Sequence, residues 1–124
     1  MTTPENKQVR LLFKKLVAKQ KVHFPARHEP LDVPKTHGVY VIYKAQEVVH
    51  VGRTLRGQNG LYQRLSNHLH GQSSFTEKYR GGSGNKLRKG YSYQYLEVRN
   101  GRMRALLEAL AVGRLSPAHL GVGT

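Results

Sequence analysis

The chain has 124 residues, in which 21 lysines and arginines against seven acidic residues give a formal net charge of +14. This excess predicts a polyanionic partner, and nucleic acid is favoured over a membrane surface because no basic helix carries an exposed apolar face. The absence of cysteine excludes disulfides and thiolate metal sites. No apolar run approaches the roughly 18 residues of a membrane span, and the N-terminus lacks the apolar segment of a signal peptide. We therefore expect a cytoplasmic protein made of a single domain, residues 1–124.

The scarcity of acidic residues also narrows the chemistry of the chain. No two of them lie close together in a predicted element, whereas a nuclease of the two-metal type needs several convergent carboxylates. A single Mg²⁺ (or Mn²⁺) ion held by one carboxylate, water and substrate phosphate is compatible with the sequence, because magnesium keeps much of its hydration shell.

The first predicted element is a helix that begins near Pro4. Its apolar residues recur at i, i+3, i+4 and i+7, the spacing of a helix with one buried stripe. After it, residues 23–37 carry three prolines without periodicity, which predicts an irregular connector. Residues 1–37 are thus expected to be an N-terminal helix and connector that precede a core in residues 38–117.

A β-hairpin is predicted from residues 39–43 and 48–51, two β-branched and aromatic runs around a polar break. Strand alternation sets His50 on the face opposite to Val49. An isolated strand tyrosine is ordinarily a packed aromatic with a wet hydroxyl, so Tyr40 by itself does not indicate a site.

A helix is predicted next, with Asn59-Gly60 as its start signal and leucines at helical spacing after it. On this helix Arg64 and His68 are four residues apart and project from one face. The plain alternative is a polar pair that faces solvent.

Two basic stretches are the predicted contacts to nucleic acid, with double-stranded DNA as the expected partner. The loop between hairpin and helix contains glycines and arginines, which suits backbone contact with phosphates, but it lacks the Gly-Lys-Ser/Thr ending of an ATP-binding loop. Residues 78–104 add eight basic residues and one acid. The predicted contacts are Arg53, Arg56, Lys86, Arg88 and Lys89.

A third strand is predicted over residues 91–98, with Tyr91, Tyr93 and Tyr95 on one face. Such a stripe can stack on bases, although tyrosines in a half-buried strand more often pack under a helix. The last helix reads MRALLEALAV, and Glu108 falls beside its apolar stripe. The plain interpretation of Glu108 is a surface ion pair with Arg104, worth about 0.3–0.5 kcal/mol.

Taken together, these motifs resemble the GIY-YIG nuclease family, and in particular its compact, restriction-endonuclease-like members. The resemblance extends from residue 38 to about residue 117. It rests on Gly38-Val39-Tyr40, His50-Val51-Gly52, Arg53, Arg64, His68 and Glu108.

The resemblance implies an α/β (α+β) fold, in which a small, mainly antiparallel three-stranded sheet is flanked by helices. It also implies a metal-dependent endonuclease that hydrolyses DNA phosphodiester bonds. In this pattern Glu108 binds Mg²⁺ and Arg64 stabilises charge on the phosphate. Tyr40, His50 and His68 prepare the attacking water.

His50 stands where the family has a tyrosine. The unperturbed pKa of a histidine is about 6.5, so His50 is a candidate general base, and the rate of cleavage would then rise with pH and level off near the pKa of His50. The alternative is that His50 only fills the space of the tyrosine. The family also has an asparagine after the last helix, where this chain has Ala118-His119-Leu120. That role is therefore either taken by His119 or absent.

These departures keep two other classes open. One is a nuclease-derived module that binds DNA or RNA without cutting it. The other is a small basic RNA-binding protein that uses its tyrosine stripe as a stacking platform. Within the nuclease hypothesis, cutting both antiparallel strands with one site per chain would call for a homodimer on DNA.

Overall fold

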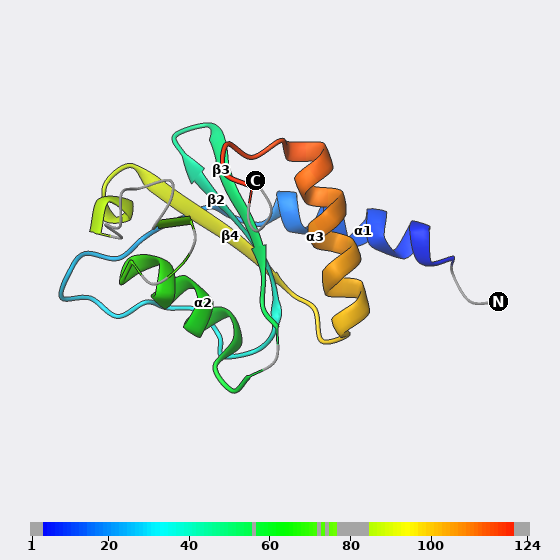
Figure 1. The fold of residues 1–124 in the computed structure, drawn as a ribbon, viewed down its shortest axis with the longest axis horizontal. Coiled ribbons are helices and arrows are strands. Elements are labelled where there is room, and N and C mark those ends of the chain that lie inside the picture. Colours follow the sequence, from blue (N-terminus) through cyan, green and yellow to red (C-terminus); the bar gives the residue numbers. More distant parts are fainter. Residues whose placement is uncertain (1–3, 56, 72, 74, 77–84, 121–124) are drawn as a thin grey trace.

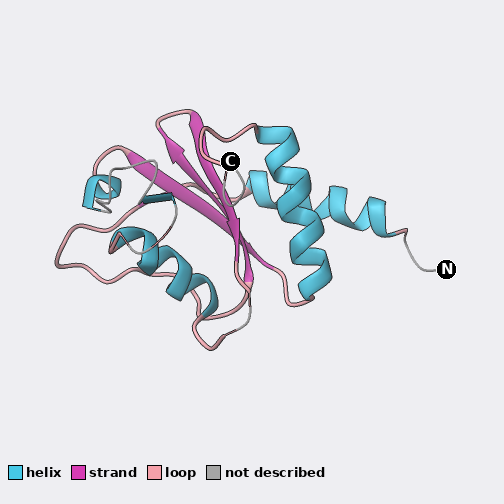
Figure 2. Cartoon of the chain, viewed as in Figure 1, coloured by secondary structure: helices cyan, strands magenta, loops and turns pink. Residues whose placement is uncertain are grey.

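The structure is a computed structural model that describes residues 4–55, 57–71, 73, 75–76 and 85–120. An antiparallel sheet runs through the molecule, with α2 on one face and α1 and α3 on the other (Figures 1 and 2). In the described part of the chain, no helix has the length and apolar character needed to cross a membrane. The elements in chain order are α1 (Glu5–Ala18), β1 (Val22–His23), β2 (Gly38–Lys44), β3 (Glu47–Arg53), α2 (Gly60–Leu69), η2 (Asn85–Arg88), β4 (Tyr91–Glu97) and α3 (Gly101–Leu115).

The sheet has four strands in the order β1-β4-β2-β3, and every neighbouring pair is antiparallel. The predicted α+β class is confirmed, but the prediction of three strands is wrong. The additional strand, β1, pairs Val22 with Tyr93 and His23 with Ser92. Two residues are too few to display the period-2 alternation by which a strand is recognised.

The hairpin of β2 and β3 contains a bulge that changes which residues face α2. Ile42 pairs with His50, but the register shifts between Ile42 and Tyr43, so that Tyr43 pairs with Val48. The additional residue, Val49, packs in the same cluster as Ile42. The predicted placement of Val49 opposite His50 is therefore wrong, because an inserted residue interrupts strand alternation.

Two apolar clusters fill the space on either side of the sheet. The cluster under α2 includes the three leucines predicted on that helix, and the cluster under α1 and α3 is built on the other face of β2 and β3. Burying such side chains, at about 1.5–3 kcal/mol each, is the main force that holds the helices on the sheet. The fully buried members include Tyr40, Ile42, Leu61, Leu65 and Phe75 in the first cluster, and Leu16, Val39, Val41 and Leu107 in the second.

The tyrosines of β4 belong to the first cluster. Tyr91 and Tyr93 are 3% and 1% exposed, and Tyr95 packs against the same cluster. Their rings therefore do not present the base-stacking platform that the RNA-binding hypothesis requires.

Gly52 leaves space for the ring of Tyr40, which crosses from the neighbouring strand. The two residues pair across β2 and β3, and a Cβ at residue 52 would collide with the hydroxyl and ring carbons of Tyr40. Tyr40 is completely buried. The glycine thus lets the ring lie across β3.

The connector fixes the start of α2. The N–H groups of Leu61 and Tyr62 donate to the carbonyls of Thr36 and Pro34 at 2.8 and 3.1 Å. These bonds satisfy donors that a helix N-terminus otherwise leaves without an intrahelical partner. Gly60 has a φ of +38°, and a Cβ there would collide with the Thr36 carbonyl, so glycine permits this close approach.

Gly52→Ala should displace the ring of Tyr40, because backbone and ring cannot both keep their positions. We expect the free energy of unfolding to fall by about 1–3 kcal/mol, the usual effect of overpacking, as measured by urea titration. Gly113→Ala is the matched control, since a Cβ at this exposed position in α3 meets nothing within 4 Å. It should raise stability by up to about 1 kcal/mol through helix propensity. Equal effects of the two substitutions would contradict the packing argument.

Candidate active site

A hydrogen-bonded chain runs from the sheet into α2 and the segment after it. The hydroxyl of Tyr40 lies 2.6 Å from Nε2 of His68, and Nδ1 of His68 lies 2.6 Å from Oγ of Ser73. Tyr40 and His68 are both completely buried, and Ser73 is 5% exposed. Low local dielectric strengthens such bonds and makes a missing partner costly.

Counting the available hydrogens shows which atom donates in each of these hydrogen bonds. Thr76 Oγ1 donates to the Ser73 carbonyl, so in its 3.0 Å contact with Ser73 Oγ it is the serine that donates. Ser73 Oγ must then accept the hydrogen of His68 Nδ1. A neutral imidazole with a proton on Nδ1 has a lone pair on Nε2. Tyr40 therefore donates its proton to His68.

The pKa values of Tyr40 and His68 agree with a hydrogen bond in which Tyr40 donates. Burial raises the pKa of Tyr40 to about 12, against a lowering effect of the charge and hydrogen bonding of Arg64. Burial lowers the pKa of His68 well below 6.5, with the neighbouring His50 and Arg64 acting in the same direction. At neutral pH the phenol is therefore protonated and the imidazole is neutral.

Arg64 lies next to Tyr40 on the same side of α2 as His68, as the i, i+4 spacing of the two helix residues predicts. Its side chain is half-buried, and its Nε has no hydrogen-bond partner among the described residues. The alternative of a solvent-facing pair is wrong for His68, which is completely buried. A buried guanidinium nitrogen without a partner is suited to an incoming anion.

Glu108 reaches the same region from α3, on the other face of the sheet. Its Oε1 lies 3.3 Å from Nε of Arg53, and both side chains are about one-third exposed. Burial raises the pKa of Glu108, while the charges of Arg53 and Arg64 lower it. The carboxylate thus lies within the electrostatic range of two arginines of the site.

The expected ion pair of Glu108 with Arg104 does not form. Arg104 is 8% exposed and donates to the carbonyls of Thr54, Val98 and Arg99 at 2.7–3.1 Å. It therefore ties the start of α3 to the ends of β3 and β4. Glu108, one turn later, is left to face Arg53.

The donor set fits one hydrated hard cation. In the part of the chain that the structure describes, no three histidine or carboxylate side chains are grouped so as to hold a metal ion. Glu108 supplies one partly exposed carboxylate, a ligand that Mg²⁺ accepts while it keeps several waters. Glu108 is thus the residue that can hold Mg²⁺ here.

His50 lies within the site but is not a strong base. Its ring stacks on Phe75 with centroids 4.8 Å apart, and its Nδ1 lies 3.1 Å from Nδ1 of His119. Burial, followed by the charges of His119 and Arg64, lowers the pKa of His50 to about 3. Because burial penalises the imidazolium, a rate limb carried by His50 would level off well below pH 6.5.

His119 is brought to the site by the segment that follows α3. The N–H groups of Ala118 and His119 donate to the carbonyls of Val48 and Val49 at 3.2 and 2.9 Å. These bonds cover part of the free edge of β3, the last strand in the sheet. His119 therefore stands beside His50, in the part of the chain where the family pattern has an asparagine.

The remaining basic residues that were predicted to contact nucleic acid differ in their surroundings. Lys86 and Lys89 are exposed at and after η2, which lies on the α2 side of the sheet (Figure 1). Arg88 instead donates to the carbonyls of Pro25 and Ala26 at 2.8 and 3.3 Å, which holds the connector. Arg56 lies outside the described residues.

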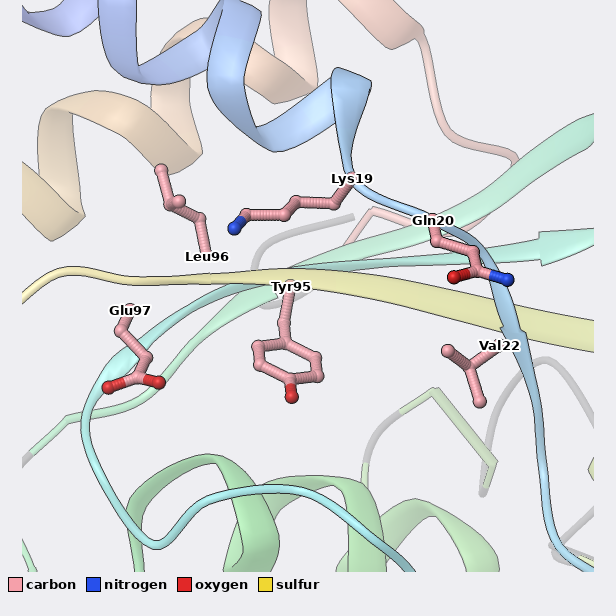
Figure 3. Close-up of a pocket in the computed structure, with 6 residues that line it drawn as sticks. All are labelled: Lys19, Gln20, Val22, Tyr95, Leu96 and Glu97. Carbon is pink, nitrogen blue, oxygen red and sulfur yellow. The ribbon is translucent and has the colours of Figure 1, made fainter.

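Two hollows flank the end of β3 at the site. One, of 320 Å³, borders Arg64 on the α2 side, and the other, of 520 Å³, is lined by Arg53 and Arg104 on the α3 side. A further cavity of 360 Å³ lies between the end of α1 and β4, where Lys19, Tyr95 and Glu97 line it (Figure 3). It contains none of the candidate catalytic residues.

Comparison with known proteins identifies the fold. No protein-family model and no curated protein sequence matches this chain. The GIY-YIG N-terminal endonuclease domain of UvrC from Thermotoga maritima, bound to magnesium as its catalytic divalent cation, aligns with a TM-score of 0.50 and 19% identity over 90% of this chain and 94% of that chain. A point mutant of that domain, also bound to its catalytic divalent cation, aligns with a TM-score of 0.50 and 18% identity over 90% and 93%. The chain has a GIY-YIG nuclease fold.

Three contributors to the site had no signal in the sequence. Ser73 and Thr76 fix the tautomer of His68, and Phe75 covers the ring of His50. All three come from residues 73–76, a stretch whose sequence shows no periodicity. Their contacts with His68 and His50 form only in the tertiary structure, so the sequence alone does not indicate them.

The buried histidines should make stability depend on pH. Both His50 and His68 have folded-state pKa values below the unfolded value of about 6.5, so below pH 6.5 the unfolded chain binds more protons. Their stabilising contribution is complete above pH 6.5 and is lost as the pH falls through the folded-state pKa values (about 3 for His50), at roughly 1.4 kcal/mol per pH unit for each histidine. Urea unfolding at pH 7 and pH 5 measures this. His50→Phe should reduce by about one the number of protons taken up on unfolding, which lowers the slope of the unfolding free energy against pH. An unchanged slope in that variant would contradict a lowered pKa of His50 in the folded protein.

Proposed function

We propose that this chain, acting as one nuclease domain over residues 1–124, is a magnesium-dependent endonuclease that hydrolyses phosphodiester bonds of DNA. The observation that carries the proposal is the buried hydrogen bond from Tyr40 to His68, with Arg64 beside it and Glu108 opposite. A nuclease fold and a net charge of +14 support it. The similar UvrC domain is described with a catalytic divalent cation, which supports a metal-dependent reaction.

Arg64 binds and neutralises the scissile phosphate in this proposal. Its Nε is buried and has no hydrogen-bond partner among the described residues. A preorganised donor of this kind stabilises the additional negative charge that develops as water attacks. Glu108 would hold Mg²⁺, which when bound supplies Lewis-acid stabilisation of charge on the phosphate and the leaving oxygen.

Tyr40 and His68 accept the proton of the attacking water. The water donates to the hydroxyl oxygen of Tyr40 while the phenol proton moves to Nε2 of His68, 2.6 Å away. Coupling of the two transfers avoids a free phenolate, whose formation is unfavourable for a group with a pKa of about 12. The buried imidazolium is offset by the negative charge that develops on the phosphate at the same time. Ser73 keeps His68 oriented through Nδ1.

The second candidate function is a nucleic-acid-binding module, for DNA or RNA, that has altered or lost catalysis. The observation that favours it is His50, which replaces the expected tyrosine and is held against Phe75 and His119 with a pKa of about 3. Such a group neither donates like a phenol nor accepts protons readily. Metal-dependent cleavage distinguishes the two functions.

Incubation of the pure protein with supercoiled plasmid should give nicked product with MgCl₂ and none with EDTA. Glu108→Gln should abolish this cleavage, because it removes the candidate metal ligand, and should leave duplex binding intact or stronger because a negative charge is lost. Gel quantification and fluorescence anisotropy measure the two properties. Full cleavage by the variant would exclude Glu108 as the ligand. Binding without cleavage by the unaltered protein would favour the binding module.

Tyr40→Phe should keep the fold and reduce the single-turnover rate by about 10²–10⁴-fold, the usual contribution of positioned proton transfer. Tyr43→Phe is the matched control. It also removes a buried strand hydroxyl, but that hydroxyl donates to Gln94 on the other face of the sheet. Its cleavage rate should stay near that of the unaltered protein. Similar rates for the two variants would remove Tyr40 from the proton path.

A further inference from the structure

The exposed side of α2 carries neutral hydrogen-bonding side chains in an otherwise basic chain. Between residues 57 and 70, Arg64 is the single residue of the Lys, Arg, Asp and Glu types, whereas α1 carries four lysines and arginines. Amide side chains cannot neutralise phosphates, but they match the donor and acceptor groups on base edges. The composition of α2 therefore suits reading bases rather than gripping the backbone.

Two amides form a fixed pair on this side of α2. Nε2 of Gln63 donates to Oδ1 of Asn67 at 2.8 Å, and Gln63 is exposed while Asn67 is half-exposed. Each amide has one carbonyl and one NH₂ group. The pair therefore leaves the carbonyl of Gln63 and the NH₂ of Asn67 to bind a ligand, side by side and already oriented.

The pair lines the 320 Å³ hollow together with Arg64 and Asn59, and no carboxylate is found among the described residues around that hollow. Its volume is at the small end of the ~300–1,000 Å³ range of ligand pockets, so it has room for one base. Asn59 occupies the N-cap position of α2, yet its side chain makes no capping bond. The connector carbonyls already serve the first N–H groups of the helix, so this amide is not needed as a cap.

We propose that this hollow is a base-reading subsite, in which Gln63 and Asn67 bind the edge of one nucleobase next to the phosphate held by Arg64. The base that fits is adenine. Its N6–H₂ donates to the Gln63 carbonyl and its N7 accepts from the Asn67 NH₂, whereas guanine presents two acceptors, thymine one acceptor and cytosine one donor. This inference rests on the proposed nucleic-acid function and adds a sequence preference to it.

Selection of duplexes tests the subsite without cleavage. The full chain is incubated in EDTA with a library of randomised DNA duplexes, and the bound fraction is sequenced. The expected result is enrichment of adenine at one position. Gln63→Ala/Asn67→Ala should lose that enrichment, and its affinity for the selected duplex should fall about ten- to a hundredfold. Gln46→Ala, in the exposed turn between β2 and β3, is the control and should keep both.

The outcomes separate the subsite from the nuclease. No enrichment by the unaltered protein, or full enrichment by the double variant, overturns the subsite, even if the plasmid is nicked with magnesium. Enrichment that depends on the pair, without any nicking, supports the subsite and overturns the nuclease. A lower melting temperature of the double variant with an unchanged preference would mean that the pair only stabilises α2, and would also overturn the subsite.

Discussion

The buried hydrogen bond between Tyr40 and His68 is the contact on which the arrangement of this site depends. It joins the central strand β2 to α2 across the apolar cluster, and both residues are completely buried. A polar pair in such a place is stable only if every donor and acceptor has a partner. Gly52 leaves the space, and Ser73 and Thr76 complete the bonds.

The site draws on both faces of the sheet because it lies near the edge strand β3. Arg64 and His68 come from α2, whereas Glu108 comes from α3 on the opposite side. Arg104 holds α3 in position by donating to three backbone carbonyls where β3 and β4 end. The position of the carboxylate is thus set by an arginine that takes no part in the proposed chemistry.

The three arginines of the site differ in the groups that balance their positive charge. The charge of Arg104 is satisfied by carbonyls and that of Arg53 by Glu108, while Nε of Arg64 has no partner among the described residues. The Arg53–Glu108 pair is partly exposed and contributes little to stability. Arg53 nevertheless places a positive charge beside the Glu108 carboxylate.

The sequence by itself determined the elements whose signal is local. The runs of residues 39–43 and 48–51 predicted the hairpin, and Arg64 and His68, four residues apart, predicted a shared helical face. The order of the short motifs indicated the nuclease fold. The hairpin and the shared helical face follow from period-2 and period-3.6 patterns, which depend only on neighbouring residues.

Tertiary structure decided what depends on distant partners. The two-residue strand β1 exists because β4 pairs with it, and the bulge at Val49 exists because residues 47–53 of β3 pair with residues 39–44 of β2, a stretch one residue shorter. The chemistry of His50 was decided in the same way. An imidazole has a pKa of about 6.5 in water, and burial against Phe75 and His119, residues 25 and 69 positions further along the chain, lowers the pKa of His50 to about 3. No local pattern carries that information, because desolvation depends on which segments pack around the ring.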